Sequence, residues 1–289
     1  MLDFELVAAR PQGPIEAVPY ARWSCPDGAD FSIFYRTLDG YVIRFPDLAD
    51  FEIAAEMFSV TCAPVPSVPI ESVCHLYRNQ IFPMMLSKKG KLVLHGSAVN
   101  ACGSAVAFLG ASGRGKSTLA ASFAMGGCPF LADDGLILEP ANSTYLVIPS
   151  HPSLRLWEDS RDALLPHDTP IAAPVHYTAK YCFIAGSQLD YCDQPQSLRV
   201  IYFLGNGRAE DVMIKRVNPA AALACLMHHS FILDVDDRPG VSAHFDRLAR
   251  LANNAACFDL DYPRCYGSLP TVLRAIRIHA SNVARHEAG

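Results

Sequence analysis

Gly110-Ala-Ser-Gly-Arg-Gly-Lys-Ser117 is the stretch of the sequence that decides the fold. It satisfies the phosphate-loop pattern Gly-x-x-x-x-Gly-Lys-Ser/Thr at every fixed position. An apolar strand is predicted before it at 105–109, and an Ala- and Leu-rich helix after it at 117–125. A glycine-rich loop between a strand and a helix turns backbone N–H groups toward an anion at the positive end of the helix. The sequence therefore predicts a nucleotide-binding α/β fold.

Each part of this loop has an expected task. Three glycines give it conformations that side chains with a Cβ disfavour. Lys116 should reach the β- and γ-phosphates of ATP, the Ser117 hydroxyl should ligate Mg²⁺, and Thr118 should lie near the α-phosphate. The expected nucleotide contacts are Gly110, Ala111, Ser112, Gly113, Arg114, Gly115, Lys116, Ser117 and Thr118. The expected cofactors are ATP and Mg²⁺.

Composition narrows the class of protein. Of 289 residues, 51% are hydrophobic and 18% charged, which argues against disorder. The net charge of −5 gives no reason to expect a nucleic-acid partner. The ten cysteines form no Cys-x-x-Cys pair and are expected to be reduced thiols. An acidic start and the lack of an 18-residue apolar run predict neither a signal peptide nor a membrane span, so we expect a cytoplasmic protein.

The hydrophobic pattern changes near residue 89 and predicts two domains, 1–88 and 89–289. The pattern of the first domain predicts a small α+β region. Its expected strands are 31–35, 41–45 and 56–61, and its expected helix is 71–86, interrupted by Pro83. The second reads as α/β. Its expected strands are 92–94, 105–109, 130–132, 136–138, 145–148, 200–204 and 212–214, and its expected helices are 117–125, 219–228, 242–255 and 269–285.

Two acids follow the strand Phe130-Leu-Ala132, as Asp133 and Asp134. In an open α/β sheet, ligands lie beyond the carboxyl ends of the strands, where these acids would be. One carboxylate can hold Mg²⁺ and the other can take a proton from an attacking hydroxyl. The alternative is a solvated Asp-Asp-Gly turn, since Asp-Gly is a strong hairpin signal. A single histidine, His95, precedes the loop by 15 residues and is by itself more typical of a structural side chain.

Together, Leu94-His95-Gly96, Gly110–Ser117 and Leu131-Ala132-Asp133-Asp134 resemble the catalytic core of the HPr kinase/phosphorylase family in order and spacing. The resemblance implies a P-loop core related to phosphoenolpyruvate carboxykinase. It also implies that Asp133 is the general base toward a seryl hydroxyl, that His95 assists it, and that Asp134 serves the metal site or orients. The likeness is specific over about residues 90–140.

The departures from that family favour a different acceptor. The first 88 residues do not resemble the longer N-terminal domain of the full-length enzymes, and the Glu-x-Arg-Gly segment of enzymes acting on HPr is absent. Instead, the chain is similar in length to HPr-kinase-like proteins encoded with lasso-peptide machinery. It shares with them a His-Gly-Ser-Ala-Val segment, at 95–99, and a Leu-Arg-Leu-Trp segment, at 154–157. Those proteins phosphorylate a serine of the precursor peptide.

The prediction is therefore a serine kinase acting on a peptide, most simply a lasso-peptide precursor. Arg155 and Lys180 are candidates for contacting the transferred phosphate or an acidic substrate, since Arg offers a bidentate fork; the alternative is two solvated surface charges. A small-molecule kinase and an ATP-binding regulatory module remain rival interpretations. No membrane or nucleic-acid partner is expected, and association into a homo-oligomer is left open.

Overall fold

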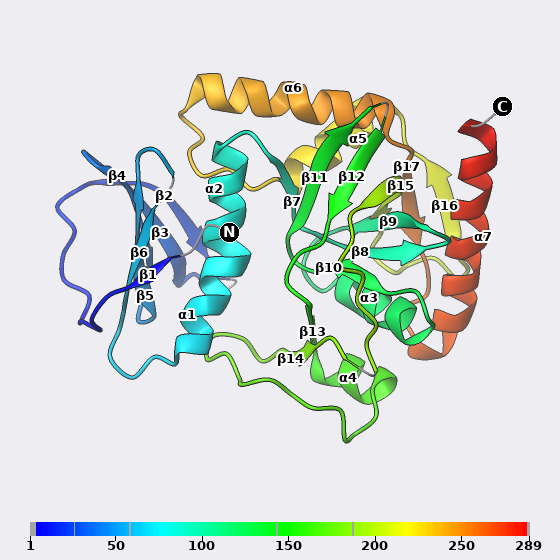
Figure 1. Ribbon diagram of the computed structural model, residues 1–289, viewed down its shortest axis with the longest axis horizontal. Helices are drawn as coiled ribbons and strands as arrows, with labels where there is room; N and C mark the ends of the chain where they lie inside the picture. The colour runs from blue at the N-terminus through cyan, green and yellow to red at the C-terminus, as the bar shows by residue number, and fades with distance from the viewer. Residues whose placement is uncertain (1–3, 26, 58, 143, 187, 288–289) are drawn as a thin grey trace. The chain divides into compact units, whose positions relative to one another are not determined.

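The chain divides into two units (Figure 1). A computed structural model describes residues 4–287 apart from 26, 58, 143 and 187. The first unit comprises Met1–Met85 together with Pro174–Thr178, and the second comprises Leu86–Ala173 and Ala179–Gly289. None of the helices in the described part of the chain combines the length and apolar character that a bilayer crossing requires.

The first unit is built on a six-stranded sheet in the order β1-β6-β5-β4-β3-β2. All neighbouring strands are antiparallel except β1 and β6, which run parallel. In β5 the side chains of Ala49, Phe51 and Ile53 are buried, as expected from the period of two in a strand. The strands are β1 (Glu5–Leu6), β2 (Pro19–Ser24), β3 (Asp30–Thr37), β4 (Gly40–Phe45), β5 (Ala49–Ala54) and β6 (Val60–Pro64).

The helix expected at 71–86 is present as three consecutive helical segments. These are α1 (Ile70–Leu76), a π-helical turn η1 (Tyr77–Ile81) and α2 (Phe82–Lys88). The turn is closed by a bond from the N–H of Phe82 to the carbonyl of Tyr77, five residues back. Pro83 follows directly; its ring cannot fit a regular α-turn and it donates no hydrogen bond. The wider turn lets the helical path continue past the proline.

The strand expected at 56–61 begins only at residue 60, so the prediction is correct for its last two residues alone. Ala55 and Glu56 form a turn, Met57 adopts a left-handed φ of 61°, and β6 begins only at Val60. Residue 58 lies outside the described residues. Met57 is buried although it follows this turn. A hydrophobic residue at this position therefore indicates a packed side chain and not a strand.

The second unit holds a nine-stranded sheet, which confirms the expected α/β class. Its main path is β10-β8-β9-β15-β12-β11-β7, and β17 pairs with both β15 and β16. The pairs β9–β15 and β15–β17 are parallel and the others antiparallel. The strands are β7 (Leu92–Leu94), β8 (Gly96–Ala101), β9 (Ser104–Leu109), β10 (Phe130–Ala132), β11 (Leu136–Ala141), β12 (Thr144–Ile148), β15 (Gln196–Leu204), β16 (Met213–Arg216) and β17 (Cys257–Asp261).

Helices cover both faces of this sheet. In β9, Val106 and Phe108 point into one core, and Ala105, Ala107 and Leu109 point into the other. The first core is closed by α3 and α7, which Figure 1 shows beside one another, and the second by α5 and α6. A strand buried on both faces explains the uninterrupted apolar run 105–109. The helices are α3 (Lys116–Met125), α5 (Pro219–His228), α6 (Arg238–Asn254) and α7 (Leu269–Glu287).

Several strands of the large sheet end or begin at one of its edges. The parallel strands β9, β15 and β17 all end at this edge. Strand β10 runs in the same direction as β9, because each is antiparallel to β8, and therefore also ends there. Strand β8 begins at the same edge, since Gly96 pairs with Leu109. A small hairpin of β13 (Ser153–Leu156) and β14 (Tyr181–Ile184), with α4 (Glu158–Leu164) after β13, completes the unit.

Candidate active site

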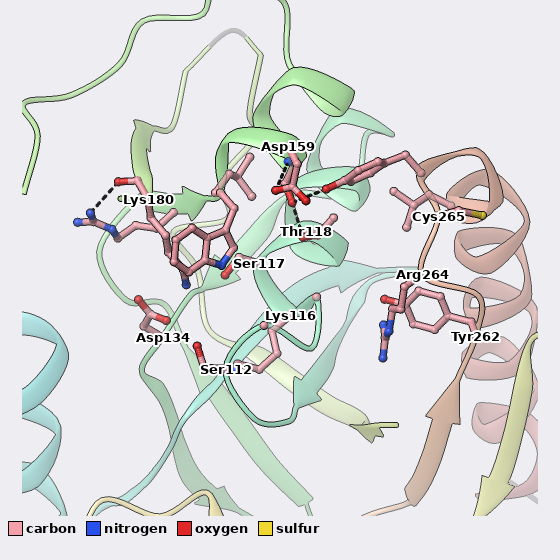
Figure 2. A pocket seen from close by; sticks show the side chains of 18 of the residues that line it. Ser112, Lys116, Ser117, Thr118, Asp134, Asp159, Lys180, Tyr262, Arg264 and Cys265 are labelled. Carbon is pink, nitrogen blue, oxygen red and sulfur yellow. Dashed lines mark hydrogen bonds between the residues drawn. The ribbon is translucent and has the colours of Figure 1, made fainter. Parts of the chain in front are cut away.

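A cavity of about 240 Å³ opens at this edge of the sheet (Figure 2). It is bounded by the loop between β9 and α3, by β13 and α4, and by the chain after β17. Its lining residues are His95, Ser112, Gly113, Gly115, Lys116, Ser117, Thr118, Asp134, Arg155, Leu156, Trp157, Asp159, Ser160, Lys180, Tyr262, Arg264, Cys265, Tyr266 and Leu269.

The loop from Gly110 to Gly115 joins β9 to α3, as the sequence predicts. Gly113 and Gly115 adopt left-handed φ values of 78° and 86°, which glycine takes at no steric cost. Gly115 is the residue before the first turn of α3, so the unpaired N–H groups of that turn lie at the end of the loop. The conformation and place of the loop match those of a phosphate cradle.

Lys116 turns back over this loop. Its Nζ donates to the carbonyl of Gly110 at 2.8 Å and to that of Ala111 at 3.2 Å. Burial lowers the pKa of the Lys116 ammonium, and the charges of Asp134 and Asp133 oppose that shift. The ammonium is therefore held inside the cradle by two carbonyl dipoles, in a position where an incoming phosphate can replace them.

Asp133 is the centre of a buried hydrogen-bond network. Its Oδ1 accepts from the Ser97 hydroxyl at 2.5 Å and from the Ser117 hydroxyl at 2.9 Å. Its Oδ2 accepts from the backbone N–H of Arg155 at 3.2 Å. Burial, reinforced by the charge of Asp134, raises the pKa of this carboxyl, while the two serine hydroxyls lower it. Asp133 joins β8, β10, α3 and β13 at one carboxylate.

Asp134 and His95 lie on the cavity wall, whereas Asp133 lies behind Ser117 and does not line the cavity. Asp134 has a left-handed φ of 63°, a conformation that Asp tolerates better than most residues. Its carbonyl lies 3.1 Å from Nδ1 of His95, and because a carbonyl only accepts, Nδ1 carries the proton. Burial, and next the charge of Lys116, lower the pKa of His95 to about 4. His95 is therefore a neutral imidazole with its Nε2 lone pair available.

Arg155 and Lys180, expected as substrate contacts, both line the cavity. The Arg155 side chain is 5% exposed; one nitrogen donates to the Lys180 carbonyl at 3.0 Å, and its Nε has no partner within the described residues. The Lys180 ammonium lies 5.6 Å from the ring centre of Trp157. A buried guanidinium with an unused donor is costly unless it meets an anion, so Arg155 is not a solvated surface charge.

Several residues in or beside the cavity were absent from the sequence-based predictions. Ser97 stands inside the quoted His-Gly-Ser segment, but nothing in the pattern alone marks its contact with Asp133. The hydroxyls of Thr118, Ser160 and Tyr266 form a chain with steps of 3.1 and 3.0 Å. Tyr262, Arg264, Cys265 and Leu269 also line the cavity and were not predicted.

The residues present fit a magnesium ion bound together with a nucleotide. Among the described residues, no three His, Cys, Asp or Glu side chains gather as a metal site of their own. Mg²⁺ in nucleotide sites, however, takes only one or two protein carboxylates and completes its shell with phosphates and water. Ser117 beside Asp133, with Asp134 on the cavity wall, supplies such a donor set.

Comparison with known proteins adds little to this geometry. No protein-family model matches the sequence, and no curated protein matches it. Among solved structures, the Hpr(Ser) kinase/phosphatase from Coxiella burnetii matches with 9% identity and a TM-score of 0.36, over 66% of this chain and 98% of that chain. A likeness at that level carries no conclusion about function.

Proposed function

We propose that the protein is an ATP- and Mg²⁺-dependent kinase that transfers the γ-phosphoryl group to a seryl hydroxyl of a peptide or protein. One observation carries the proposal: the hydroxyl of Ser117, at the start of the helix behind the phosphate loop, bonds to the buried carboxylate of Asp133. The contact joins the cradle to the acid pair at the wall of the cavity, where Ser117 and Asp134 are lining residues. A binding module needs the cradle and an acid for the metal, but it has no use for a second acid that serves as a base or for His95.

Electrostatic stabilisation would come from groups already fixed in place. Phosphoryl transfer needs little covalent chemistry from the protein and depends mainly on positioning and on charge stabilisation. The backbone N–H groups of the loop and the Lys116 ammonium would hold the β- and γ-phosphates. Bound Mg²⁺ would neutralise charge developing on those phosphates. Arg155, whose Nε has no hydrogen-bond partner among the residues that the structure describes, would meet the transferred group.

Removal of the hydroxyl proton falls to the acids and His95. We propose Asp133 as the base; its raised pKa keeps it closer to the range in which a carboxylate accepts a proton efficiently. This role requires that Ser117 release Asp133 when it turns to the metal. Asp134 and the Nε2 of His95 are the groups that already face the cavity, and they would orient the hydroxyl or relay its proton.

The proposed acceptor is the serine of a short ribosomal peptide, a lasso-peptide precursor. Support comes from the resemblance in the segments at 95–99 and 154–157 and from the absent Glu-x-Arg-Gly segment. The cations Arg155 and Lys180 on the cavity wall suit an acceptor that carries a carboxylate near its serine. An extended peptide tail entering the cavity would meet this requirement.

The test is phosphorylation of the peptide encoded beside this protein. After incubation with MgATP, mass spectrometry should show a gain of one phosphate, and Ser→Ala in the peptide should abolish it. Phosphorylation of free metabolites with the peptide untouched would support the small-molecule kinase instead. ATP binding without transfer to any hydroxyl would support the regulatory module.

A further inference from the structure

The cavity has two chemically different ends (Figure 2). Asp134 and Lys180 lie on one side of Lys116, and Tyr262, Arg264 and Cys265 lie on the other. The acids belong where phosphoryl transfer takes place, since they would serve the metal and the hydroxyl. A nucleotide held by its phosphates at Lys116 must then extend in the opposite direction. We propose that the segment Tyr262–Leu269, with Asp159, forms the nucleoside-binding end of the cavity, an inference that rests on the proposed use of ATP.

Tyr262 and Arg264 are built against the phosphate loop. A Cβ added to Gly115 would lie 3.1 Å from the Tyr262 hydroxyl and 3.3 Å from Nη1 of Arg264. The Arg264 guanidinium lies over the Tyr262 ring at 4.0 Å, and its Nη2 donates to the carbonyl of Gly205 at 3.0 Å. A planar cation fixed in this way presents a flat surface beside the cradle. Such a surface suits the π-face of a nucleobase.

The backbone below this pair is fixed by Asp261, the last residue of β17. Its carboxylate accepts from the backbone N–H groups of Gly207, Arg208, Ala209 and Tyr262, at 2.7 to 3.3 Å. These bonds tie the chain after β15 to the chain after β17, and they lower the pKa of Asp261 against the opposing effect of burial. The flat surface is therefore preorganised, which limits the ordering cost of binding.

Polar groups suited to a ribose also line the cavity, around Tyr266 of the same segment. The Asp159 carboxylate lines the cavity, and Oδ1 accepts from the N–H of Ser160 at 2.9 Å. The hydroxyls of Ser160 and Tyr266 connect it to Thr118, the residue expected near the α-phosphate. An ionised carboxylate only accepts hydrogen bonds and matches the donors of a sugar diol. Asp159 is therefore the candidate contact for the ribose, and Arg264 with Tyr262 the candidate surface for the base.

Cys265 makes the proposal testable without any assay of activity. Cys265 is exposed and lines this end of the cavity. Cys102 is also exposed, but it lies in the turn between β8 and β9, outside the cavity. Alkylation by iodoacetamide can be followed for each cysteine by mass spectrometry of its peptide. Bound ATP should slow alkylation of Cys265 by about tenfold or more. At ATP concentrations well above the Kd, the thiol can react only in the small fraction of molecules whose site is empty. Cys102 should react at an unchanged rate.

Tripolyphosphate separates the nucleoside end from the phosphate end. It fills the cradle without a nucleoside and should leave Cys265 reacting as in the free protein. Equal protection of Cys265 by tripolyphosphate, or ATP that binds by calorimetry yet leaves Cys265 unprotected, would overturn this inference and leave the proposed kinase intact. Failure of ATP to bind at all would overturn both.

A pair of variants gives a second measurement. Arg264→Ala should weaken ATP binding on the order of tenfold by removing the stacked cation, and should change tripolyphosphate affinity far less. Arg208→Ala is the matched control, because Arg208 is also exposed and belongs to the adjoining loop but does not line the cavity. Equal losses for ATP and tripolyphosphate in Arg264→Ala would show that Arg264 acts on phosphate rather than on the nucleoside, and would overturn the assignment.

Discussion

Ser117 and Ser97 donate to the same oxygen of Asp133, one from the first turn of α3 and one from β8. Only Ser117 also lines the cavity. The two hydroxyls therefore have the same effect on the carboxylate but differ in their access to a metal. This difference can be measured.

Ser117→Ala should raise the Mg²⁺ concentration for half-maximal activity by on the order of tenfold, whereas Ser97→Ala should leave it unchanged. Each hydroxyl lowers the pKa of Asp133, so either substitution should raise that pKa and move the acidic limb of kcat/KM to higher pH. Magnesium titrations at several pH values check both statements. An equal shift in the magnesium requirement for both variants would contradict the metal role of Ser117.

Lys116→Ala should sharply weaken ATP binding and leave the fold intact. The ammonium contacts only the Gly110 and Ala111 carbonyls among the hydrogen bonds described, so its removal breaks contacts within the loop and none that joins separate helices or strands. Isothermal calorimetry measures the affinity, and circular dichroism checks the fold. Lys91→Ala is the control, because Lys91 forms an exposed ion pair with Glu139 outside the cavity. Unchanged affinity in a folded Lys116→Ala protein would refute the assignment of the cradle.

Asp133→Asn should keep MgATP binding and lower turnover by about 10²-fold or more, the usual contribution of a positioned base. The amide oxygen can still accept from Ser97 and Ser117, but the amide nitrogen cannot accept from the N–H of Arg155, so a melting-temperature measurement must accompany the assay to show that the variant stays folded. His95→Ala should give a smaller loss in the same direction. Asp134→Asn is the informative comparison: a larger loss there, with near-normal turnover in Asp133→Asn, would transfer the base role to the acid that faces the cavity.

Acid should destabilise the protein partly through His244, far from the proposed site. This side chain is 5% exposed, and neither ring nitrogen has a hydrogen-bond partner among the described residues. Burial lowers its pKa to about 4, so between about pH 6.5 and pH 4 the unfolded chain binds the extra proton. Stability from this group is complete above pH 6.5 and is lost as the pH falls toward 4.

His244→Phe removes that titration. From pH 7 to pH 5, its melting temperature should fall by a few degrees less than that of the unchanged protein, at roughly 2–4 °C per kcal/mol for a chain of this size. The same substitution at the exposed His167 serves as the control. Parallel pH profiles for His244→Phe and the unchanged protein would mean that the buried ring does not contribute.

The glycine-rich loop between a strand and a helix was predictable because its information is local. Gly110–Ser117 carries its own glycines, lysine and hydroxyl, and the apolar residues on either side fix the strand and the helix. The acid pair was predictable for a related reason, since it follows an apolar strand whose end had to lie near the loop. In both cases a few adjacent residues contain the whole signal.

The position of Tyr262 and Arg264 beside the phosphate loop was not predictable, since it depends on pairing between distant strands. Tyr262 and Arg264 reach the loop only because β17 pairs in parallel with β15, which itself pairs in parallel with β9. No local pattern marks Asp261 as the residue that fixes this edge. By contrast, β5 was overlooked although Ala49, Phe51 and Ile53 alternate with polar residues, and the hydrophobic Met57 led instead to a strand where the chain turns.

The first unit includes Pro174–Thr178, a segment that the chain supplies only after it has traversed the phosphate loop and the hairpin strand β13. Within that unit, the backbone N–H of His176 donates to the hydroxyl of Ser72 at 3.0 Å, and Tyr177 contacts Phe31. During synthesis, the N-terminal sheet must therefore wait for these residues to leave the ribosome before its packing is complete. A gene cut after residue 85 would encode all six strands of that sheet but not the segment that finishes it.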